Sequence, residues 1–580
     1  MFVKKNIFYR TLELLSSDQR AKGLVVIFLL MVGSLLDFFS LATFFPLILL
    51  VVNPGLIEDF PLLQDAYHFF GFTNSSSLGI SLTLLVLIFT LLKTRINQWI
   101  AFRKASYAYG IGNDMATSAI ERYFKLPYQE FTNIDFAKEL NQLSNIPLIF
   151  ANNIIIPAGT LISEILVLLI LCFTIAMYQV KVFSLLFLIL VPAYFIYRLN
   201  RKHASAISTS IGIAYPKLLK YTLQIVEGLI DIRSFQKESF FKKRFDETNK
   251  EVGQIFSLDH ASQTDTARAT ELVAVFCLCL MLLYSLISQQ NQQETLLLLG
   301  VYAGVGLRIV PSINRIFSAL HQIRINNHVI NELPDIIGLA DDDLGNQVQA
   351  TTFNSTIHIN KISFSYPAGS QILQKTTMVI KKGEKIAITG VSGTGKTTLF
   401  LILLGLLDVL EGKILLDGKS VNKMVWRKLF GYVPQQPYIL DASIAENIAF
   451  GIPGKEINRE KINAILTQME LSEWVNSLPD GIDTTVGEKG LKMSGGQRQR
   501  LAIARGLYYD PEILLLDEVT NQLDPHTEAE IVETLEKAAS GKTIIMIAHR
   551  PDLFKHFDHV YELIDGTVRE MALNALSPAS

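Results

Sequence analysis

Long apolar runs in the first 335 residues constrain this chain more than any other feature. Crossing the roughly 30 Å hydrocarbon core of a bilayer takes about 20 predominantly apolar residues. Six segments have this character, and the fourth and sixth have the least distinct boundaries: 23–52, 78–102, 147–178, 182–199, 269–288 and 296–323. We therefore predict an all-α transmembrane domain with six spans over residues 1–335.

The remaining residues have the pattern of a soluble domain. Segment 336–355 is acidic and polar and indicates a linker, whereas 356–575 alternates apolar strands, helices and turns in the manner of an α/β domain. The formal net charge of the whole chain is -2, so no overall basic field favours nucleic acid as a partner. The sequence thus predicts a multi-domain membrane protein with one soluble α/β domain.

Lys and Arg residues between the spans indicate which side of the membrane each connection faces. The leader before Gly23 and the connections 103–146 and 200–267 are rich in these residues, whereas 53–77 and 289–295 contain none. Basic connections stay on the cytoplasmic side. We therefore expect both termini and the soluble domain in the cytoplasm, with the two long connections forming helices that reach that domain.

A glycine-rich loop carries the strongest chemical motif of the soluble domain. It follows the apolar segment EKIAITG, precedes the helical TLFLILLGLL and matches the phosphate-binding pattern G-x-x-x-x-G-K-[ST]. In such loops backbone N–H groups approach phosphate, the lysine reaches the β- and γ-phosphates, and the hydroxyl binds Mg²⁺. The motif predicts an ATP and Mg²⁺ site, with Thr397 on the metal, formed by Gly390, Ser392, Gly393, Gly395, Lys396, Thr397 and Thr398.

Two consecutive acids end a second apolar strand, PEILLLDE. Asp517 stands where a carboxylate would hold Mg²⁺, often through water. Glu518 lies one residue further, where it can orient or deprotonate the attacking water. Two acids after a strand are a weak motif alone and a strong one beside a phosphate-binding loop. We expect Asp517 to bind the metal and Glu518 to be the catalytic base.

The sequence MSGGQRQR at 493–500 precedes that strand, and with it residues 356–575 resemble the ABC ATPase family. The family signature is LSGGQ, and Met493 replaces its leucine. The resemblance implies that Gln435 senses Mg²⁺ and that His549 contacts the γ-phosphate, both as catalytic groups. It further implies ATP contacts from Tyr366, which would stack on adenine, and from Ser494, Gly495, Gly496, Gln497 and Asp524.

Two segments of the soluble domain have further counterparts in this family. Asn521 and Gln522 replace the usual Ser-Ala of the D-loop that contains Asp524, while TTVGEKG around Glu488 resembles the segment that exporters place against the coupling loops. No catalytic group of the family is missing. The resemblance therefore implies a domain that hydrolyses ATP.

The resemblance also implies that ATP lies between the phosphate loop of one cassette and the signature of another. This chain has one of each, so we predict a C2 homodimer, with a heterodimer of related half-transporters as the alternative. Twelve spans would then enclose an export pathway in a bacterial inner membrane. The expected partners are a second identical chain, membrane lipid and the transported cargo.

Charged residues inside the spans indicate the cargo, because such residues are costly there and usually face a cavity or a partner. Arg308 and Arg315 are seven residues apart and share a helix face. Arginine suits phosphate, to which it donates two parallel hydrogen bonds. The residues thus favour an amphipathic, phosphate-bearing cargo or, alternatively, arginines that pair with Asp37 and Glu164 or face cytoplasmic water. The predicted pathway residues are Arg95, Arg268, Arg308 and Arg315.

The predicted transmembrane domain also resembles the flippases of lipid-linked oligosaccharides in bacterial protein glycosylation. The similar positions are the arginines and Pro311 of GLRIVPSINRI, together with Asp37 and Glu164. The resemblance implies a polyprenyl-pyrophosphate glycan as cargo and a short external helix, for which Phe60–Phe70 is the candidate. The alternatives are an exporter of drugs, peptides or another lipid, and a non-transporting ATPase or regulated channel on the same scaffold.

Overall fold

The computed structural model divides the chain into two compact units, which are described separately. One comprises Met1–Leu126 and Ile134–Asp342, and the other comprises Pro127–Asn133 and Asp343–Ser580. The boundary after Asp342 falls inside the predicted linker. The structure describes residues 7–43, 75–131, 134–178, 180–287, 292–337, 352–367, 369, 371–421, 423–487, 490, 492–519 and 525–571.

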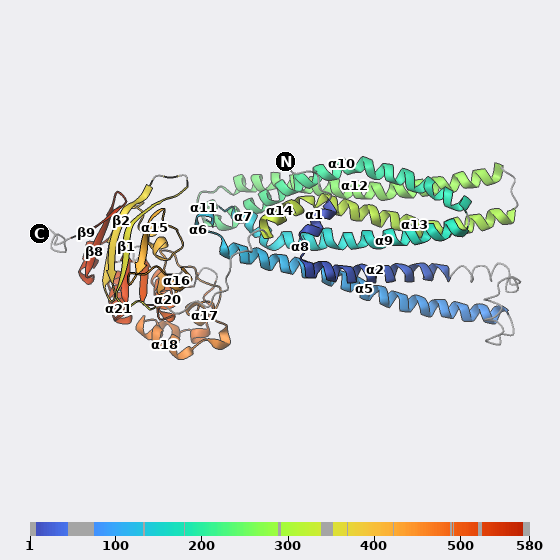
Figure 1. Cartoon of the computed structure of the whole chain (residues 1–580). Coiled ribbons are helices and arrows are strands. Elements are labelled where there is room, and N and C mark those ends of the chain that lie inside the picture. The colour runs from blue at the N-terminus through green and yellow to red at the C-terminus, as the bar shows by residue number, and fades with distance from the viewer. Residues whose placement is uncertain are drawn as a thin grey trace. The chain divides into compact units, whose positions relative to one another are not determined.

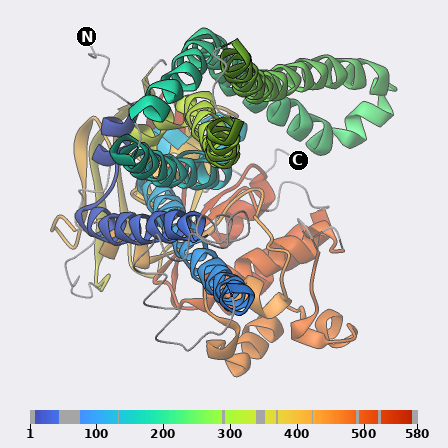
Figure 2. The same ribbon diagram turned by 90° about the vertical axis from the view of Figure 1, so that its right-hand side faces the viewer.

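The first unit is all helical. Its long helices run alongside one another in Figure 1, and Figure 2 shows them nearly end-on, with α2 and α5 in blue and α10 and α12 in green. The long helices are α2 (Ser17–Ala42), α5 (Ser75–Lys125), α9 (Ile156–Tyr178), α10 (Val180–Glu227), α12 (Glu238–Ile287) and α13 (Gln292–Ile325). Shorter helices are α1 (Ile7–Glu13), α7 (Phe136–Leu140), α8 (Ile146–Phe150), α11 (Leu229–Ser234) and α14 (Asn327–Ile337).

The helix that contains the third predicted span begins earlier than the apolar run does. Two π-helical turns, η2 (Asn141–Asn145) and η3 (Ala151–Ile155), connect α7, α8 and α9 into one path. A π turn adds one residue to the helical repeat and so rotates the side chains that follow it. The inward-facing side chains of this α7–α9 path, among them Phe150 and Ile154, pack with α5 and α14 in a buried cluster.

Three helical segments of the described part of the chain are long and apolar enough to cross a membrane: Ser17–Ser40, Ser77–Lys125 and Phe136–Thr174. The other predicted spans, 182–199, 269–288 and 296–323, fall mainly on α10, α12 and α13. The count of six spans stays a prediction. The proposed external helix Phe60–Phe70 lies outside the described residues.

The second unit contains two sheets. A six-stranded sheet has the order β5-β6-β7-β3-β8-β9, parallel except for β9, and an antiparallel sheet has the order β2-β1-β4. The larger sheet contains β3 (Lys385–Thr389), β5 (Phe430–Val433), β6 (Ile513–Asp517), β7 (Thr543–Ile547), β8 (His559–Ile564) and β9 (Thr567–Met571). The smaller one contains β1 (Thr356–Ser365), β2 (Gln371–Lys381) and β4 (Glu411–Leu416).

Helices cover both faces of the six-stranded sheet. Along β6 every residue is buried, and alternate side chains enter different clusters: Leu515 packs with α15 and the smaller sheet, whereas Leu516 packs with α20 and α21. Strands buried on both faces are continuous apolar runs, as ILLL at 513–516 is here. The helices of this unit are α15 (Lys396–Leu403), α16 (Lys423–Lys428), α17 (Ile444–Ile448), α18 (Arg459–Gln468), α19 (Ser472–Asn476), α20 (Gly495–Tyr508) and α21 (Pro525–Ala538), with single turns η4 (Gly454–Glu456), η5 (Gly481–Asp483) and η7 (Pro551–His556).

A short segment from the first predicted cytoplasmic connection belongs to this second unit. Pro127–Asn133 contains α6 (Tyr128–Phe131), and Tyr128 packs against the cluster that holds α15. The sequence-based division assigned these residues to the domain 1–335. The partly buried ring of Tyr128 is the physical reason for the difference, because its apolar contacts lie with the soluble domain.

Candidate functional site

Four neighbouring parallel strands deliver the predicted catalytic groups to one edge of the sheet. Strand β5 leads to Gln435, β6 to Asp517 and Glu518, β7 to His549, and β3 to the glycine-rich loop. Ligands of open parallel sheets bind outside the carboxyl ends of the strands. Residues that are far apart in the sequence therefore meet here because of strand order.

The glycine-rich loop requires its glycines at two positions. Gly395 has a φ of +105°, and a Cβ there would lie 2.4 Å from Ile372 Cγ2; Gly390 has a φ of +145°, and its Cβ would lie 2.7 Å from Leu563 O. Other residues would be strained in this backbone and would clash with their neighbours. The loop thus has the shape that brings backbone N–H groups to a phosphate at the start of α15.

Lys396 is folded into the loop that precedes it. Its Nζ donates to Gly390 O at 2.9 Å and to Val391 O at 3.0 Å, and the residue is 4% exposed. Burial lowers the pKa of Lys396, while the nearby carboxylates of Glu518 and Asp517 oppose that shift. The ammonium is therefore held by weak neutral acceptors that a phosphate can replace.

Thr397 and Asp517 form an oxygen pair suited to Mg²⁺. Thr397 Oγ1 donates to Asp517 Oδ1 at 3.4 Å, and Asp517 is 3% exposed. Burial, together with the charge of Glu518, raises the pKa of Asp517. A buried carboxylate next to a second acid fits a hard cation with oxygen ligands. Within the described residues no cluster of three or more His, Cys, Asp or Glu forms a separate metal site.

Glu518 is held at both carboxylate oxygens by the two other residues that were predicted to be catalytic. Gln435 Nε2 donates to Oε2 at 2.7 Å, and His549 Nε2 lies 2.8 Å from Oε1. Glu518 has a φ of +48°, a conformation that non-glycine residues seldom adopt and that concentrates at functional sites. The three side chains thus form one group at the strand ends.

The signature residues lie at the start of α20. Ser494 Oγ accepts from Gln497 N at 3.2 Å, and Gln497 Oε1 accepts from Ser494 N at 2.9 Å, which is a capping box. Ser494 and Gly495 are exposed at this helix end. A helix N-terminus with free N–H groups attracts an anion.

The remaining predicted ATP contacts have different outcomes. Tyr366 follows β1, is partly buried and packs edge-on against Phe364, with 5.0 Å between the ring centroids. Its contact with adenine stays a prediction. Asp524 and Glu488 lie outside the described residues.

Sequence analysis missed two side chains that touch this site. Tyr432 Oη donates to Asp517 Oδ2 at 3.4 Å from the adjacent strand, and Gln499 Nε2 donates to Gln435 O at 3.2 Å. Burial, followed by the charge of Asp517, raises the pKa of Tyr432, so the phenol stays a donor. The tyrosine of GYVPQQP, which directly precedes the last residue of β5, was the available clue.

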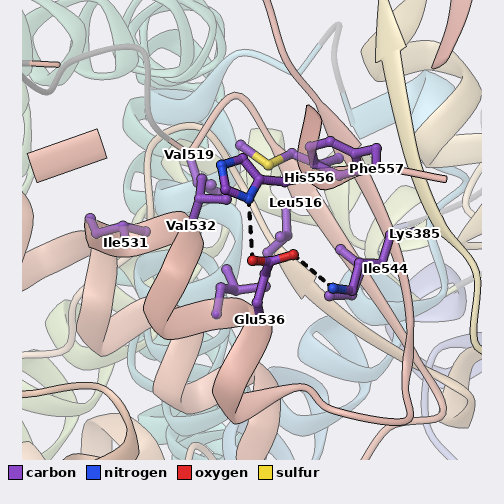
Figure 3. A pocket seen from close by; sticks show the side chains of 11 residues that line it. Lys385, Leu516, Val519, Ile531, Val532, Glu536, Ile544, His556 and Phe557 are labelled. Atoms are coloured by element: carbon purple, nitrogen blue, oxygen red, sulfur yellow. Dashed lines mark hydrogen bonds and ion pairs between the residues drawn. The ribbon is translucent and has the colours of Figure 1, made fainter. Parts of the chain in front are cut away.

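A small cavity in the same domain does not belong to this site (Figure 3). Glu536 bridges Lys385 Nζ at 2.7 Å and His556 Nδ1 at 3.2 Å beside it. The remaining lining is almost entirely apolar and includes Leu516, which faces the opposite side of the sheet from Leu515. The cavity has a volume of only about 10 Å³, which is at most enough for one water molecule.

The first, all-helical unit, which is the membrane unit, pairs two of its predicted pathway arginines with acids. Arg308 Nη2 lies 2.8 Å from Asp37 Oδ2, and Arg315 Nε lies 2.5 Å from Glu164 Oε1. Lys93 Nζ also lies 3.2 Å from Asp37 Oδ1. The ion pairs that the sequence left as an alternative are therefore present.

The other two pathway candidates do not join these pairs. Arg95 and Arg268 are exposed on α5 and α12. Their role in a pathway stays a prediction.

Comparisons with known proteins agree with this site. The sequence model of the ABC transporter family matches residues 373–521. The chain is 39% identical over 221 residues to the ABC multidrug transporter MDR1 of Cryptococcus neoformans var. grubii serotype A, covering 37% of this chain and 16% of that protein. It is 35% identical over 245 residues to the ATP-dependent lipid A-core flippase of Syntrophus aciditrophicus strain SB, covering 42% and 39%. The matching part of the chain thus spans well under half of the length of each of these curated relatives.

The fold has a counterpart along nearly the whole chain. A bacterial Atm1-family ABC exporter with ATP bound superposes with a TM-score of 0.75 at 20% identity, covering 96% of each chain. The predicted fold class, a helical membrane domain plus an α/β P-loop domain, is confirmed. This chain therefore has the fold of an ABC exporter, with helical segments long and apolar enough to cross a membrane, and its residues 373–521 match the ATP-binding domain of the ABC transporter family.

Proposed function

We propose that this chain hydrolyses ATP to move an amphipathic, phosphate-bearing lipid across a bacterial inner membrane. The observation that carries the ATPase part is the convergence of Gln435, Glu518 and His549 beside the phosphate loop. Names of relatives support the transport part, since they include a multidrug transporter and a lipid A-core flippase. Drug or peptide export is the alternative cargo class.

The residues divide the hydrolytic work among them. Lys396 exchanges its loop carbonyls for phosphate oxygens, and Glu518 accepts a proton from the attacking water or orients it. His549 and Gln435 keep the Glu518 carboxylate in place until the γ-phosphate arrives. Mg²⁺, held by Thr397 and Asp517, would neutralise charge on the phosphates.

A homodimer completes the site in this proposal. In the single chain Ser494 bonds to its own helix, whose exposed N-terminus is free to meet the ATP of a second chain. ATP binding would close the two cassettes, and hydrolysis with product release would open them.

Mixing two inactive variants tests the dimer. Lys396→Ala and Ser494→Arg homodimers should both be inactive, whereas a heterodimer of the two retains one site with both intact halves. Phosphate release from that heterodimer is the expected result, with each homodimer as the control. Full activity of either homodimer, or of a protein that is monomeric during the assay, would refute the shared site.

Surplus positive charge among the spans supports an anionic cargo. Asp37 faces two cations, Lys93 and Arg308, and Glu164 faces Arg315 while it interacts electrostatically with Lys104. Each cluster therefore has one more cation than acid. Arg308 Nε is buried and has no hydrogen-bond partner in the described part of the chain, so one arginine donor is unused. We propose a polyprenyl-pyrophosphate glycan as the ligand.

Lipid flipping in proteoliposomes tests this cargo. A fluorescent glycan on polyprenyl pyrophosphate is compared with the same glycan on a neutral lipid of equal chain length. We expect ATP-dependent movement and stimulated ATPase activity with the pyrophosphate alone. Equal movement of both lipids would remove the phosphate requirement, and ATPase stimulated only by drugs or peptides would favour the alternative.

A further inference from the structure

The signature helix is connected to the catalytic base of its own chain by two consecutive hydrogen bonds. Gln499, the fifth residue of α20, donates from Nε2 to the backbone oxygen of Gln435 at 3.2 Å. The side chain of Gln435 in turn donates to Glu518 Oε2 at 2.7 Å. The helix that begins at the signature and the base thus both bond to Gln435.

Packing alone does not explain a glutamine at position 499. The residue is only 6% exposed, and its Oε1 has no hydrogen-bond donor among the described residues. A buried amide with an unused acceptor is less favourable than an apolar side chain of similar size. The bond that it does make, to Gln435 O, is therefore its distinctive contribution.

Other contacts attach the segment after Gln435 to the same helix. Arg505 donates from Nη1 to Tyr438 O at 2.7 Å and from Nε to Asn447 O at 2.8 Å, and its guanidinium lies 4.7 Å from the ring centroid of Phe450. Several bonds fix this later part of the segment. Gln499 fastens the residue whose side chain reaches the base.

We propose that Gln499 is a positioning residue that connects the two composite ATP sites of the dimer. The inference rests on the proposed function, in which the signature of one chain contacts ATP held by the other. When α20 moves on that contact, Gln499 carries the movement to Gln435 and changes how Glu518 of the same chain is held. Occupation of one site then prepares the base of the other.

A heterodimer with one working base tests the connection. One chain carries Glu518→Gln, so turnover depends on Glu518 of the other chain, and two affinity tags isolate the mixed dimer. Gln499→Leu in the chain with the working base should lower kcat roughly fivefold or more, with KM for ATP unchanged. The same substitution in the chain with Glu518→Gln should leave turnover intact, because it interrupts a connection to a base that is already inactive.

The controls separate positioning from support of the helix. Tyr508→Phe removes one hydrogen bond from the same helix, the one that Asn458 N donates to Tyr508 Oη, and should have no effect in either chain. Gln499→Met repeats the test with an unbranched side chain if the leucine variant folds poorly. The inference would be overturned if Gln499→Leu lowered kcat equally in either chain, or if it lowered kcat only in the chain that carries Glu518→Gln. A wild-type protein that is monomeric or inactive would instead refute the proposed function.

A second readout uses the symmetric dimer. With Gln499→Leu in both chains, the Hill coefficient for ATP hydrolysis should fall towards one from a wild-type value above one. A helix that is merely loosened would lower the melting temperature without changing the Hill coefficient. An unchanged coefficient in a folded, dimeric variant would count against the connection.

Discussion

The ATP-binding domain and the membrane helices both hold charged groups in at least partly buried positions, but they bring them together differently. In the ATP-binding domain, Lys396 bonds to carbonyl groups five and six residues before it, and both acids come from the end of a single strand, β6. In the membrane unit, Asp37 and Arg308 are 271 residues apart on different helices. A short motif therefore identifies a site in the first region, whereas an isolated charge in the second identifies only the need for a partner.

The largest expected effect tests whether the motif identifies the chemistry. Glu518→Gln keeps the shape of the side chain but removes the base, so turnover should fall about 10²–10⁴-fold while ATP still binds. Phosphate release measures turnover, and a fluorescent ATP analogue measures binding. Turnover close to that of the wild type would mean that another group is the base and that the motif misidentifies it.

A smaller effect is expected from a residue that the motif does not include. Tyr432→Phe removes the hydroxyl that bonds to Asp517, so the Mg²⁺ concentration for half-maximal ATPase activity should rise about tenfold. Tyr561→Phe, on β8 and packed against the same cluster, is the matched control. Equal shifts in the two variants would show that the change is not specific to the metal ligand.

The membrane ion pairs should differ in stability. Arg308→Ala leaves Asp37 with Lys93 and with Asn97, which donates to it at 2.9 Å. Arg315→Ala leaves Glu164, whose side chain is only 11% exposed, without its closest cation. The second variant should therefore lose more stability, by about 1–3 kcal/mol. Melting curves in one detergent compare them; a larger loss for Arg308→Ala would mean that Lys93 does not compensate.

The smallest effect concerns pH and the surface of the ATP-binding domain. Burial raises the pKa of Glu536, but the bonds to Lys385 and His556 outweigh it and hold that pKa below its ordinary 4.5. Because the pKa of Glu536 is lower in the folded protein than in the unfolded chain, the pairing stabilises the fold fully at pH values above the ordinary pKa. That stabilisation is lost as the pH falls through the lowered pKa of the folded protein. Glu536→Gln should cost about 0.3–1 kcal/mol at pH 7, since the groups are partly exposed, and less at acid pH. Melting temperatures of both proteins across pH would show a constant difference if the carboxylate does not contribute.

The motifs predicted most of the ATP site because the order of the strands in the sheet brings the motif residues together. Lys396, Asp517, Glu518, Gln435 and His549 all lie at one sheet edge, as expected from strands that end together. Tyr432 was missed because its partner depends on the pairing of β5 with β6, where Tyr432 lies opposite Leu515. No sequence pattern states which strands are neighbours.

The membrane unit was less predictable for a physical reason. A helical repeat places Arg308 and Arg315 on one face of α13 but does not say which helix that face meets. The sequence left cargo binding and pairing as alternatives, and the structure shows pairing with acids on α2 and α9. The segment 127–133 was likewise assigned by position in the chain, although the partly buried ring of Tyr128 packs against the core of the soluble domain.

The capping box at the start of α20 has a consequence for the speed of association. Ser494 and Gln497 already satisfy each other's backbone N–H groups in the single chain, so the first turn is ordered before any partner arrives. Ordering a segment at the moment of binding costs conformational entropy and slows productive encounters. A turn that is formed in advance avoids that cost. In the proposed dimer, the closing step would then depend on diffusion and reorientation of rigid bodies rather than on local folding.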